Sequence, residues 1–179
     1  MNRRPLRIIG INPGTRYLGI AVLEGPELMD WRIKALKGKW SEEKNKKAVK
    51  IVSDLIERYA PNVLAIKKLH PSRRTENLLR ITNTIKSFTR RRDLKIYQYY
   101  IKEIEKSLIE GQKLNKQNLY ELMARLYPAL HHDLKKEQSH KNPYYFRVFE
   151  AVALGVACFH SVFEVRIDKQ EKRQLKYLD

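Results

Sequence analysis

IIGINPGTR, residues 8–16, carries the strongest structural signal in the chain. A short apolar run, Leu6–Ile11, leads into Asn12 and a Pro-Gly pair, which is typical of a buried strand that ends in a turn. A second apolar run, residues 17–23, ends at Glu24-Gly25-Pro26, and a third strand fits residues 28–36. The sequence therefore predicts three consecutive strands, with a polar side chain at the end of the first. Strand ends of this kind often carry functional residues.

The rest of the chain alternates between helices and strands and then becomes helical. Ser41 is placed to cap a helix, because Glu42 and Glu43 follow it and apolar residues then keep helical spacing until Pro61. Strands that alternate with helices indicate parallel pairing. After the first helix we expect, in chain order, a strand at 63–66, a helix at 78–88, a strand at 94–99, a helix from Asn115 to Pro128, a polar linker at 131–143 and a buried helix at 145–162.

The length of the chain, 179 residues, predicts one domain. We place that domain at residues 1–165 and expect the charged residues 166–179 to form a tail that frays or extends as a surface helix. Cys158 is the only cysteine, so no intramolecular disulfide can form, and we expect it to be a small core residue. The sequence shows no secretory signal or confident membrane span, so we expect a cytoplasmic location and no membrane partner.

The chain is strongly basic. Lys and Arg total 37 against 20 Asp and Glu, a net charge of +17, while 42% hydrophobic content is typical of a folded protein. A charge excess of this size favours nucleic acid as a partner, because each phosphate that the protein neutralises releases counterions. A protein that is merely basic is the alternative, since net charge describes association and not fold.

Residues 8–22, IIGINPGTRYLGIAV, resemble the first hairpin of the RuvC-type Holliday junction resolvases in the RNase H-like superfamily. Two further segments follow in the order that this family requires, PNVLAIKK at 61–68 and RVFEAVAL at 147–154. The resemblance spans residues 6–160 and implies an α/β, RNase H-like fold, with a five-stranded mixed sheet, its first three strands antiparallel, and helices on both faces. The order of strands and helices along the chain, as expected from the residues alone, agrees with this fold.

The resemblance also implies a site of four acids that hold two Mg²⁺ ions, which activate water for phosphodiester cleavage. In this sequence Asn12, Lys67 and Arg147 stand at three of the four catalytic positions, and only Glu150 keeps an acid. The four side chains sum to about +1, where four carboxylates would give about −4. We therefore expect no metal and no cofactor. Glu150 is the one candidate metal ligand, and Mg²⁺ is the cofactor if nuclease activity is retained.

Glu150 is also the candidate partner of Lys67, because an isolated buried charge is costly. The geometry that the resemblance implies predicts an ion pair between the two. A shifted register would place Lys68 at the same point without changing the charge. A single engineered Asp→Asn change would explain Asn12 but neither Lys67 nor Arg147, so natural degeneration is the simpler interpretation.

Basic residues cluster after the 63–66 strand and along the helix that follows it. They predict a nucleic-acid-binding surface, and a solvated helix face is the alternative. Tyr97, Tyr99 and Tyr100 could stack on unpaired bases or pack at the rim of the core. The candidate nucleic-acid-binding residues are Arg16, His70, Arg73, Arg74, Arg80, Lys86, Arg90, Arg91 and Arg92.

Together these observations predict a RuvC-like pseudonuclease that binds branched DNA or structured RNA in recombination or repair, alone, as a homodimer or as a heterodimer. One alternative is an active, Mg²⁺-dependent crossover junction endonuclease that recruits other acids, such as Asp30 or Glu24. Another is a regulatory or structural subunit that pairs with an active homologue. Whether the chain is an enzyme therefore stays open on the sequence alone.

Overall fold

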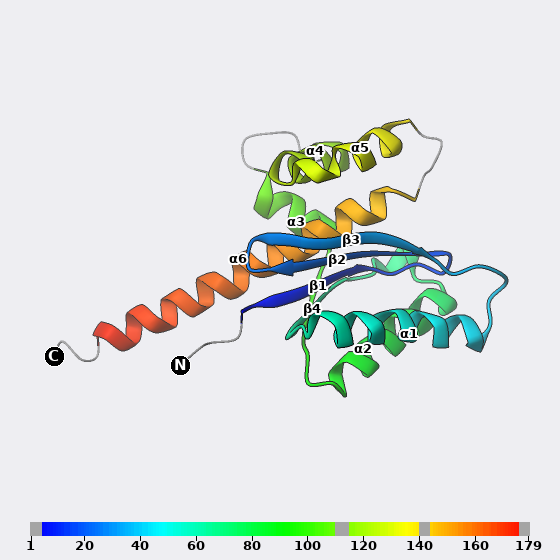
Figure 1. Cartoon of the computed structure of the whole chain (residues 1–179), viewed down its shortest axis with the longest axis horizontal. Coiled ribbons are helices and arrows are strands. Elements are labelled where there is room, and N and C mark those ends of the chain that lie inside the picture. The colour runs from blue at the N-terminus through cyan, green and yellow to red at the C-terminus, as the bar shows by residue number, and fades with distance from the viewer. Residues whose placement is uncertain (1–4, 110–114, 140–143, 176–179) are drawn as a thin grey trace.

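A five-stranded mixed sheet lies at the centre of the structure (Figure 1). The structure is a computed structural model and describes residues 5–109, 115–139 and 144–175. Its strands are β1 (Arg7–Asn12), β2 (Tyr17–Glu24), β3 (Glu27–Ala35), β4 (Val63–Lys67) and β5 (Lys95–Tyr99). Its helices are α1 (Glu42–Tyr59), α2 (Glu76–Arg90), α3 (Ile101–Leu108), α4 (Lys116–Leu126), α5 (His131–Gln138) and α6 (Phe146–Leu175), with short 3-10 helices η1 (Pro71–Arg73) and η2 (Pro128–Leu130).

The strand order is β3-β2-β1-β4-β5. β1 pairs antiparallel with β2, and β2 with β3, whereas β1 pairs parallel with β4, and β4 with β5. The three antiparallel strands are the three that the opening sequence predicts, and the parallel strands are those separated by helices. The predicted fold class, an α/β RNase H-like fold with helices on both faces of a mixed sheet, is confirmed.

Alternation along β1 divides its side chains between two cores. Ile9 and Ile11 are buried in the cluster that includes residues of α1 and α2. Ile8 is buried in the other cluster, to which α3, α4 and α6 contribute, and Gly10 and Asn12 share its face by the same alternation. Helices therefore cover both faces of the sheet, and the polar end of β1 points toward α6.

The helix boundaries follow from local sequence. The Ser41 hydroxyl accepts a hydrogen bond from the backbone N–H of Lys44 and caps α1, as predicted. The helix ends at Ala60, whose φ of 43° is left-handed, just before Pro61. Asn115 caps α4 in the same way, through a bond from the N–H of Asn118. These caps fix where the helices begin over the sheet.

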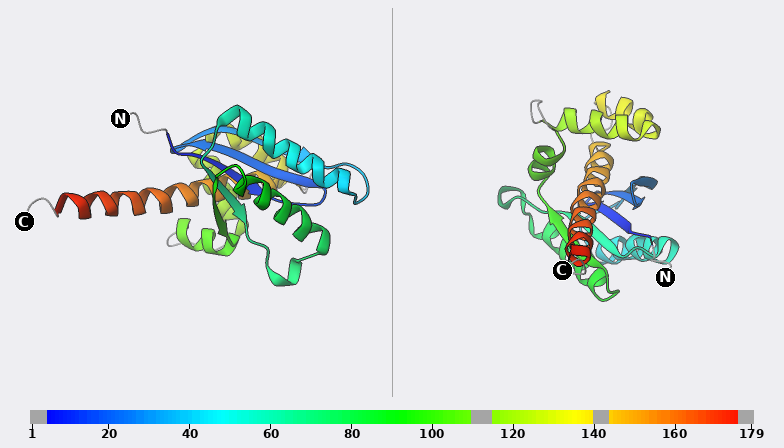
Figure 2. Two further views of the ribbon diagram at one scale, coloured as in Figure 1. Left: turned by 90° about the horizontal axis from the view of Figure 1, so that it is seen from below. Right: turned by 90° about the vertical axis from the view of Figure 1, so that its left-hand side faces the viewer.

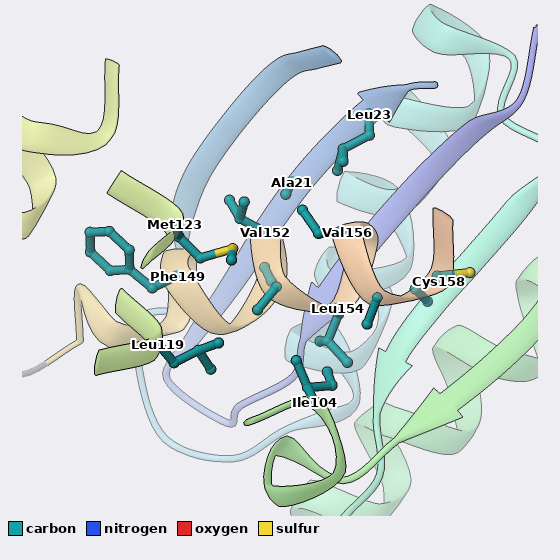
Figure 3. Packing of buried hydrophobic residues seen from close by; sticks show 14 of the residues in the cluster. Ala21, Leu23, Ile104, Leu119, Met123, Phe149, Val152, Leu154, Val156 and Cys158 are labelled. Atoms are coloured by element: carbon teal, nitrogen blue, oxygen red, sulfur yellow. The ribbon is translucent and has the colours of Figure 1, made fainter. Parts of the chain in front are cut away.

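α6 lies across the middle of the sheet, and Figure 3 shows its apolar side chains packed against β2, α3 and α4. Two glycines, one on β1 and one on β2, allow the α6 backbone to lie in close contact with these strands. A Cβ on Gly10 would lie 2.1 Å from the carbonyl oxygen of Ala151, and one on Gly19 would lie 2.1 Å from that of Arg147. Because α6 lies directly on these two strands, the first turn of α6 reaches the end of β1. Cys158 is fully buried in this core, as predicted.

Two features differ from the sequence prediction. Residues 131–138 of the predicted linker form α5, and α3 follows β5 where no helix was expected. At the end of α4, Leu126 is 52% exposed, because Tyr120 and Ala124 belong to the buried face of this helix. α6 runs as one helix to Leu175 and projects beyond the sheet (Figures 1 and 2), so residues 166–175 are helical, which is one of the two forms expected for the tail. Within the described part of the chain, no helix is long and apolar enough to cross a membrane.

Candidate functional site

Asn12 and Lys67 lie side by side at the carboxyl ends of two parallel strands. The register pairs Ile11 of β1 with Ile66 of β4, so the next residues of the two strands come level. Ile11 and Ile66 both belong to the core on the α1 and α2 side, which places Asn12 and Lys67 on the opposite face, toward α6. Asn12 is fully buried, whereas 21% of the Lys67 side chain is exposed.

Glu150, in the second turn of α6, lies at the centre of the site and is fully buried. Its Oε2 accepts hydrogen bonds from Asn12 Nδ2 at 2.7 Å and from Lys67 Nζ at 2.5 Å. Its Oε1 lies 3.3 Å from Lys116 Nζ and accepts a bond from the Tyr120 hydroxyl at 3.4 Å. The predicted Lys67–Glu150 ion pair is confirmed, and it forms at Lys67 and not at Lys68.

Arg147 completes the group one helical turn before Glu150. Its Nη1 donates to Asn12 Oδ1 at 3.3 Å and to the carbonyl oxygen of Pro13 at 3.1 Å. Gly14 leaves room for this guanidinium, because a Cβ there would lie 2.7 Å from Arg147 Cζ. The structure therefore brings together all four positions that the sequence singled out.

The cations of the site repel one another. Burial lowers the pKa of the Lys67 ammonium, the Glu150 carboxylate opposes this shift, and the charges of Lys116 and Arg147 add to it. Burial likewise lowers the pKa of Arg147, and Glu150 again opposes the shift. The Glu150 carboxylate thus interacts favourably with three cations, Lys67, Lys116 and Arg147.

Lys116 and Tyr120 belong to the site but were not predicted from the sequence. They lie one turn apart on α4, so both can face Glu150. The sequence places Lys116 directly after the N-cap Asn115, where a surface lysine is ordinary, and nothing local indicates which element α4 covers. Packing of α4 against α6 supplies that information.

Aromatic rings hold the start of α6 at this edge of the sheet. The Tyr17 ring, at the beginning of β2, stacks on Tyr144 with centroids 4.4 Å apart and planes 18° apart. The ring of Phe146 lies 5.7 Å from Lys116 Nζ and 5.1 Å from Arg147 Cζ. Both distances are typical of cation–π contacts. These contacts fix the helix turn that carries Arg147.

The family model for the crossover junction endodeoxyribonuclease RuvC matches residues 8–140, about three quarters of the chain. This chain belongs to the RuvC family. No curated protein matches its sequence. The match begins at β1, where the sequence resemblance is most specific, and it confirms the family expected from the residues.

Solved structures show the same fold. Thermus thermophilus RuvC is 16% identical, with a TM-score of 0.70 over 89% of this chain and 97% of that chain. The same protein in complex with a Holliday junction substrate is 15% identical, with a TM-score of 0.69 over 88% of this chain and 96% of that chain. The yeast mitochondrial Holliday junction resolvase Ydc2 is 10% identical, with a TM-score of 0.55 over 88% of this chain and 80% of that chain.

The residues at this RuvC-family site do not fit a divalent metal. Mg²⁺ needs several oxygen ligands, chiefly carboxylates, at about 2 Å. Here both oxygens of Glu150, the one carboxylate among the four positions, already accept bonds from cationic and neutral donors. Among the described residues, no group of three or more His, Cys, Asp or Glu could hold a metal ion. An excess of positive charge also opposes a dication.

The other acids considered from the sequence lie away from the site. Glu24 is paired with Arg7 at the opposite end of the β1–β2 hairpin from Asn12. Asp30 forms an ion pair with Arg32 and accepts a hydrogen bond from the Tyr59 hydroxyl at the end of α1, 2.8 Å away. Neither carboxylate reaches Glu150, so the expectation that they could complete an acidic site is wrong.

Four of the predicted nucleic-acid-binding residues share the edge of the sheet that carries the site. Arg16 follows β1 and is exposed, and His70, Arg73 and Arg74 follow β4 and are exposed as well. Because β1 and β4 are parallel, both segments leave the sheet beside Lys67. Arg74 is held by a bond from its Nε to the carbonyl oxygen of Leu69, 3.1 Å away.

The remaining basic residues divide into two groups. Arg80 forms ion pairs with Glu42 and Glu76, and Lys86 donates to Gln98 at 3.2 Å. Partial burial lowers the pKa of Lys86, and the charges of Arg90 and Arg74 add to the shift. Arg91 and Arg92 precede Lys95, the first residue of β5, which pairs with Val63 at the start of β4. They therefore lie at the amino ends of these strands, opposite the carboxyl ends that carry the site. A five-residue strand spans about 16 Å.

The tyrosines near the end of β5 have structural contacts. Tyr97 and Tyr99 pack against the α6 core, and the Tyr99 hydroxyl lies 3.0 Å from Ser161 Oγ. Burial raises the pKa of Tyr99. Tyr100 precedes α3, and its ring lies 4.8 Å from Lys68 Nζ. Packing at the core rim therefore accounts for Tyr97 and Tyr99, and Tyr100 lies beside exposed His70.

Proposed function

We propose that this RuvC-family chain binds branched DNA without cutting it. The observation that carries the proposal is the state of Glu150, whose two carboxylate oxygens are occupied by Asn12, Lys67, Lys116 and Tyr120. Cleavage in the family, as the resemblance implies, needs two dications held by acids. A site that places an ammonium and a guanidinium at two of those positions has one carboxylate among the four, Glu150, whose oxygens are already bonded.

The charge distribution supports DNA binding by the same edge of the sheet. Arg16, Arg73 and Arg74 are exposed around the site, and the chain carries a net charge of +17. Phosphate contacts of this kind supply affinity and fix the position of the protein on DNA. A solved neighbour, T. thermophilus RuvC, is described in complex with a Holliday junction substrate, which makes a four-way junction the first substrate to test.

The test measures binding and cleavage in the same sample. A labelled four-way DNA junction is mixed with excess protein in Mg²⁺ or Mn²⁺, and complex formation is read by native electrophoresis and cleavage by denaturing electrophoresis. We expect a complex, no nicks and the same affinity in EDTA. Paired nicks on opposing strands that disappear in EDTA would overturn the proposal.

Two competitors establish what the complex recognises. Linear duplex of the same length and a structured RNA hairpin are titrated against the bound junction at physiological salt, because affinities are meaningful only at a stated salt concentration. We expect the junction to be preferred at least tenfold over both. Equal affinity for all three would mean that binding depends on nonspecific charge attraction alone. Preference for the hairpin would assign the site to RNA.

A further inference from the structure

Three cations surround one carboxylate at the site. Lys67 and Lys116 contact the two oxygens of Glu150, and Arg147 lies one turn away on the same helix. The Glu105 carboxylate on α3 lies close enough to interact with Lys116 and Glu150, so three positive charges face two negative charges, an excess of one. Burial lowers the pKa of Lys67, and the charges of Lys116 and Arg147 lower it further.

The excess charge reaches the protein surface. Glu150 is fully buried beneath the cations, whereas 21% of the Lys67 side chain and 48% of the Lys116 side chain are exposed. Each ammonium has three N–H donors, and the contact with Glu150 uses one of them. The two ammonium groups therefore bring N–H donors and positive charge to the surface, whereas the Glu150 carboxylate is buried.

Lysines on α1 show the ordinary arrangement by contrast. Lys46 pairs with Glu43 at 3.2 Å, and Lys50 pairs with Asp54, in each case one exposed lysine with one exposed carboxylate. Such pairs leave no local excess of charge and contribute little to stability. At the site, the ring of Phe146 beside Lys116 and Arg147 also limits their hydration on one side.

We propose that Lys67 and Lys116 hold a backbone phosphate of the DNA directly, in the place where active relatives would use metal ions. Charged N–H donors bind phosphate oxygens strongly and need no coordination geometry. The inference rests on the proposed function, because it names the contact by which a non-cleaving site would hold its DNA. It makes the site a phosphate-binding site in its own right.

The main variant is Lys116→Gln, with Lys46→Gln as the matched control. Both lysines are exposed near the N-terminal end of a helix and paired with a glutamate, but only Lys116 lies at the site. In EDTA, we expect Lys116→Gln to bind the junction about fivefold more weakly and to reduce the slope of log K against log[salt] by about 1. The control should match the unchanged chain. Equal behaviour of the two variants would overturn the inference.

Glu150→Gln tests the same idea with the opposite sign. The amide keeps the shape of the side chain and raises the excess of positive charge at the site from one to two. We expect about threefold tighter junction binding. A purely structural role for Glu150 predicts weaker binding, and an active metal site predicts loss of Mg²⁺-dependent function. If this variant does not fold, Lys116→Gln still decides the matter.

Free phosphate and a DNA phosphodiester share the chemistry that this site recognises. The junction complex is therefore titrated with inorganic phosphate, with sodium chloride at equal ionic strength as the reference. We expect the two salts to release the junction equally, because the phosphodiester is held together with its neighbours. Specific displacement by inorganic phosphate would show a site for the free anion and overturn the assignment to DNA.

The two proposals fail in different ways. Nicking of the junction by the unchanged chain defeats the proposed function, whatever the lysine variants do. Junction binding without nicking, at an affinity that Lys116→Gln leaves unchanged, defeats only the phosphate contact.

Discussion

The two faces of the sheet differ in what their residues do. On the α1 and α2 side, Ile9 and Ile11 of β1 and Leu64 and Ile66 of β4 are buried in an apolar cluster. On the α6 side, the same two strands end in Asn12 and Lys67, which meet charged residues of α4 and α6. Alternate residues of one strand thus have different roles: those facing α1 and α2 pack in the core, and those facing α6 at the strand end form the site.

This division would let a RuvC-family fold tolerate different residues at the strand ends. Side chains alternate along a strand, so replacing an acid at its end leaves the apolar residues of the opposite face in place. The buried carboxylate of Glu150 gains Lys67 as a partner, which keeps its charge compensated. The fold and the chemistry of the site are therefore separable, and the predictions below test that separation.

The largest effect is expected on the packing face. Ile11→Ala removes a fully buried side chain between β1 and the α1 and α2 helices and should cost about 2–5 kcal/mol of unfolding free energy. Urea denaturation measures the loss. Junction affinity per folded molecule should stay within about twofold, and a large loss of affinity in the folded protein would show that the two faces are coupled.

A smaller loss is expected where α6 lies on the sheet. Gly10→Ala places a Cβ 2.1 Å from the Ala151 carbonyl oxygen, so the α6 backbone must move. Overpacking of this kind costs about 1–3 kcal/mol. Because Arg147 and Glu150 move with α6, this substitution should also weaken junction binding, unlike Ile11→Ala. Unchanged stability would contradict the close packing that we describe.

Lys67→Met removes one of the four partners of Glu150. Three partners stay, so we expect a cost of about 1–2 kcal/mol, measured by urea denaturation at pH 7. Lys68→Met is the control, because this next residue is exposed and lies over the ring of Tyr100. It should cost less than about 1 kcal/mol. Equal costs would mean that the Lys67–Glu150 pair contributes nothing specific.

The smallest effect concerns the pKa of Lys67. Burial already lowers this pKa, and Glu150 opposes the shift, so Glu150→Gln should lower it further. Between the lowered pKa and the unfolded value near 10.5, the unfolded chain binds more protons, so this group makes stability rise with pH in that window. NMR titration of the lysine ammonium groups measures the pKa. An increase in the variant would contradict the ion pair.

The sequence was most informative where local chemistry determines structure. Apolar runs broken by Pro-Gly and Gly-Pro pairs located the first two strands, and Ser41 and Asn115 located two helix starts. The family resemblance placed Lys67 and Glu150 at one site, and the ion pair between them is present. Each of these expectations rests on neighbouring residues or on a recognisable motif.

Other features depend on packing between distant segments. Lys116 lies 34 positions from Glu150 in the sequence, and only the docking of α4 on α6 brings the two together. The edge of the sheet that each basic residue occupies also follows from topology, which separates Arg91 and Arg92 from Arg73 and Arg74. Polar composition made residues 131–138 resemble a linker, although they form α5.

The central claim is that the site holds no divalent metal, and a calorimetric titration with Mg²⁺ and with Mn²⁺ tests it most directly. The unchanged chain is compared with the triple variant Asn12→Asp, Lys67→Glu, Arg147→Asp, which places acids at the three positions where the family resemblance implies them. We predict no binding at the site of the unchanged chain and binding, with metal-dependent junction cleavage, in the variant. Metal binding by the unchanged chain that Glu150→Gln abolishes would contradict the account.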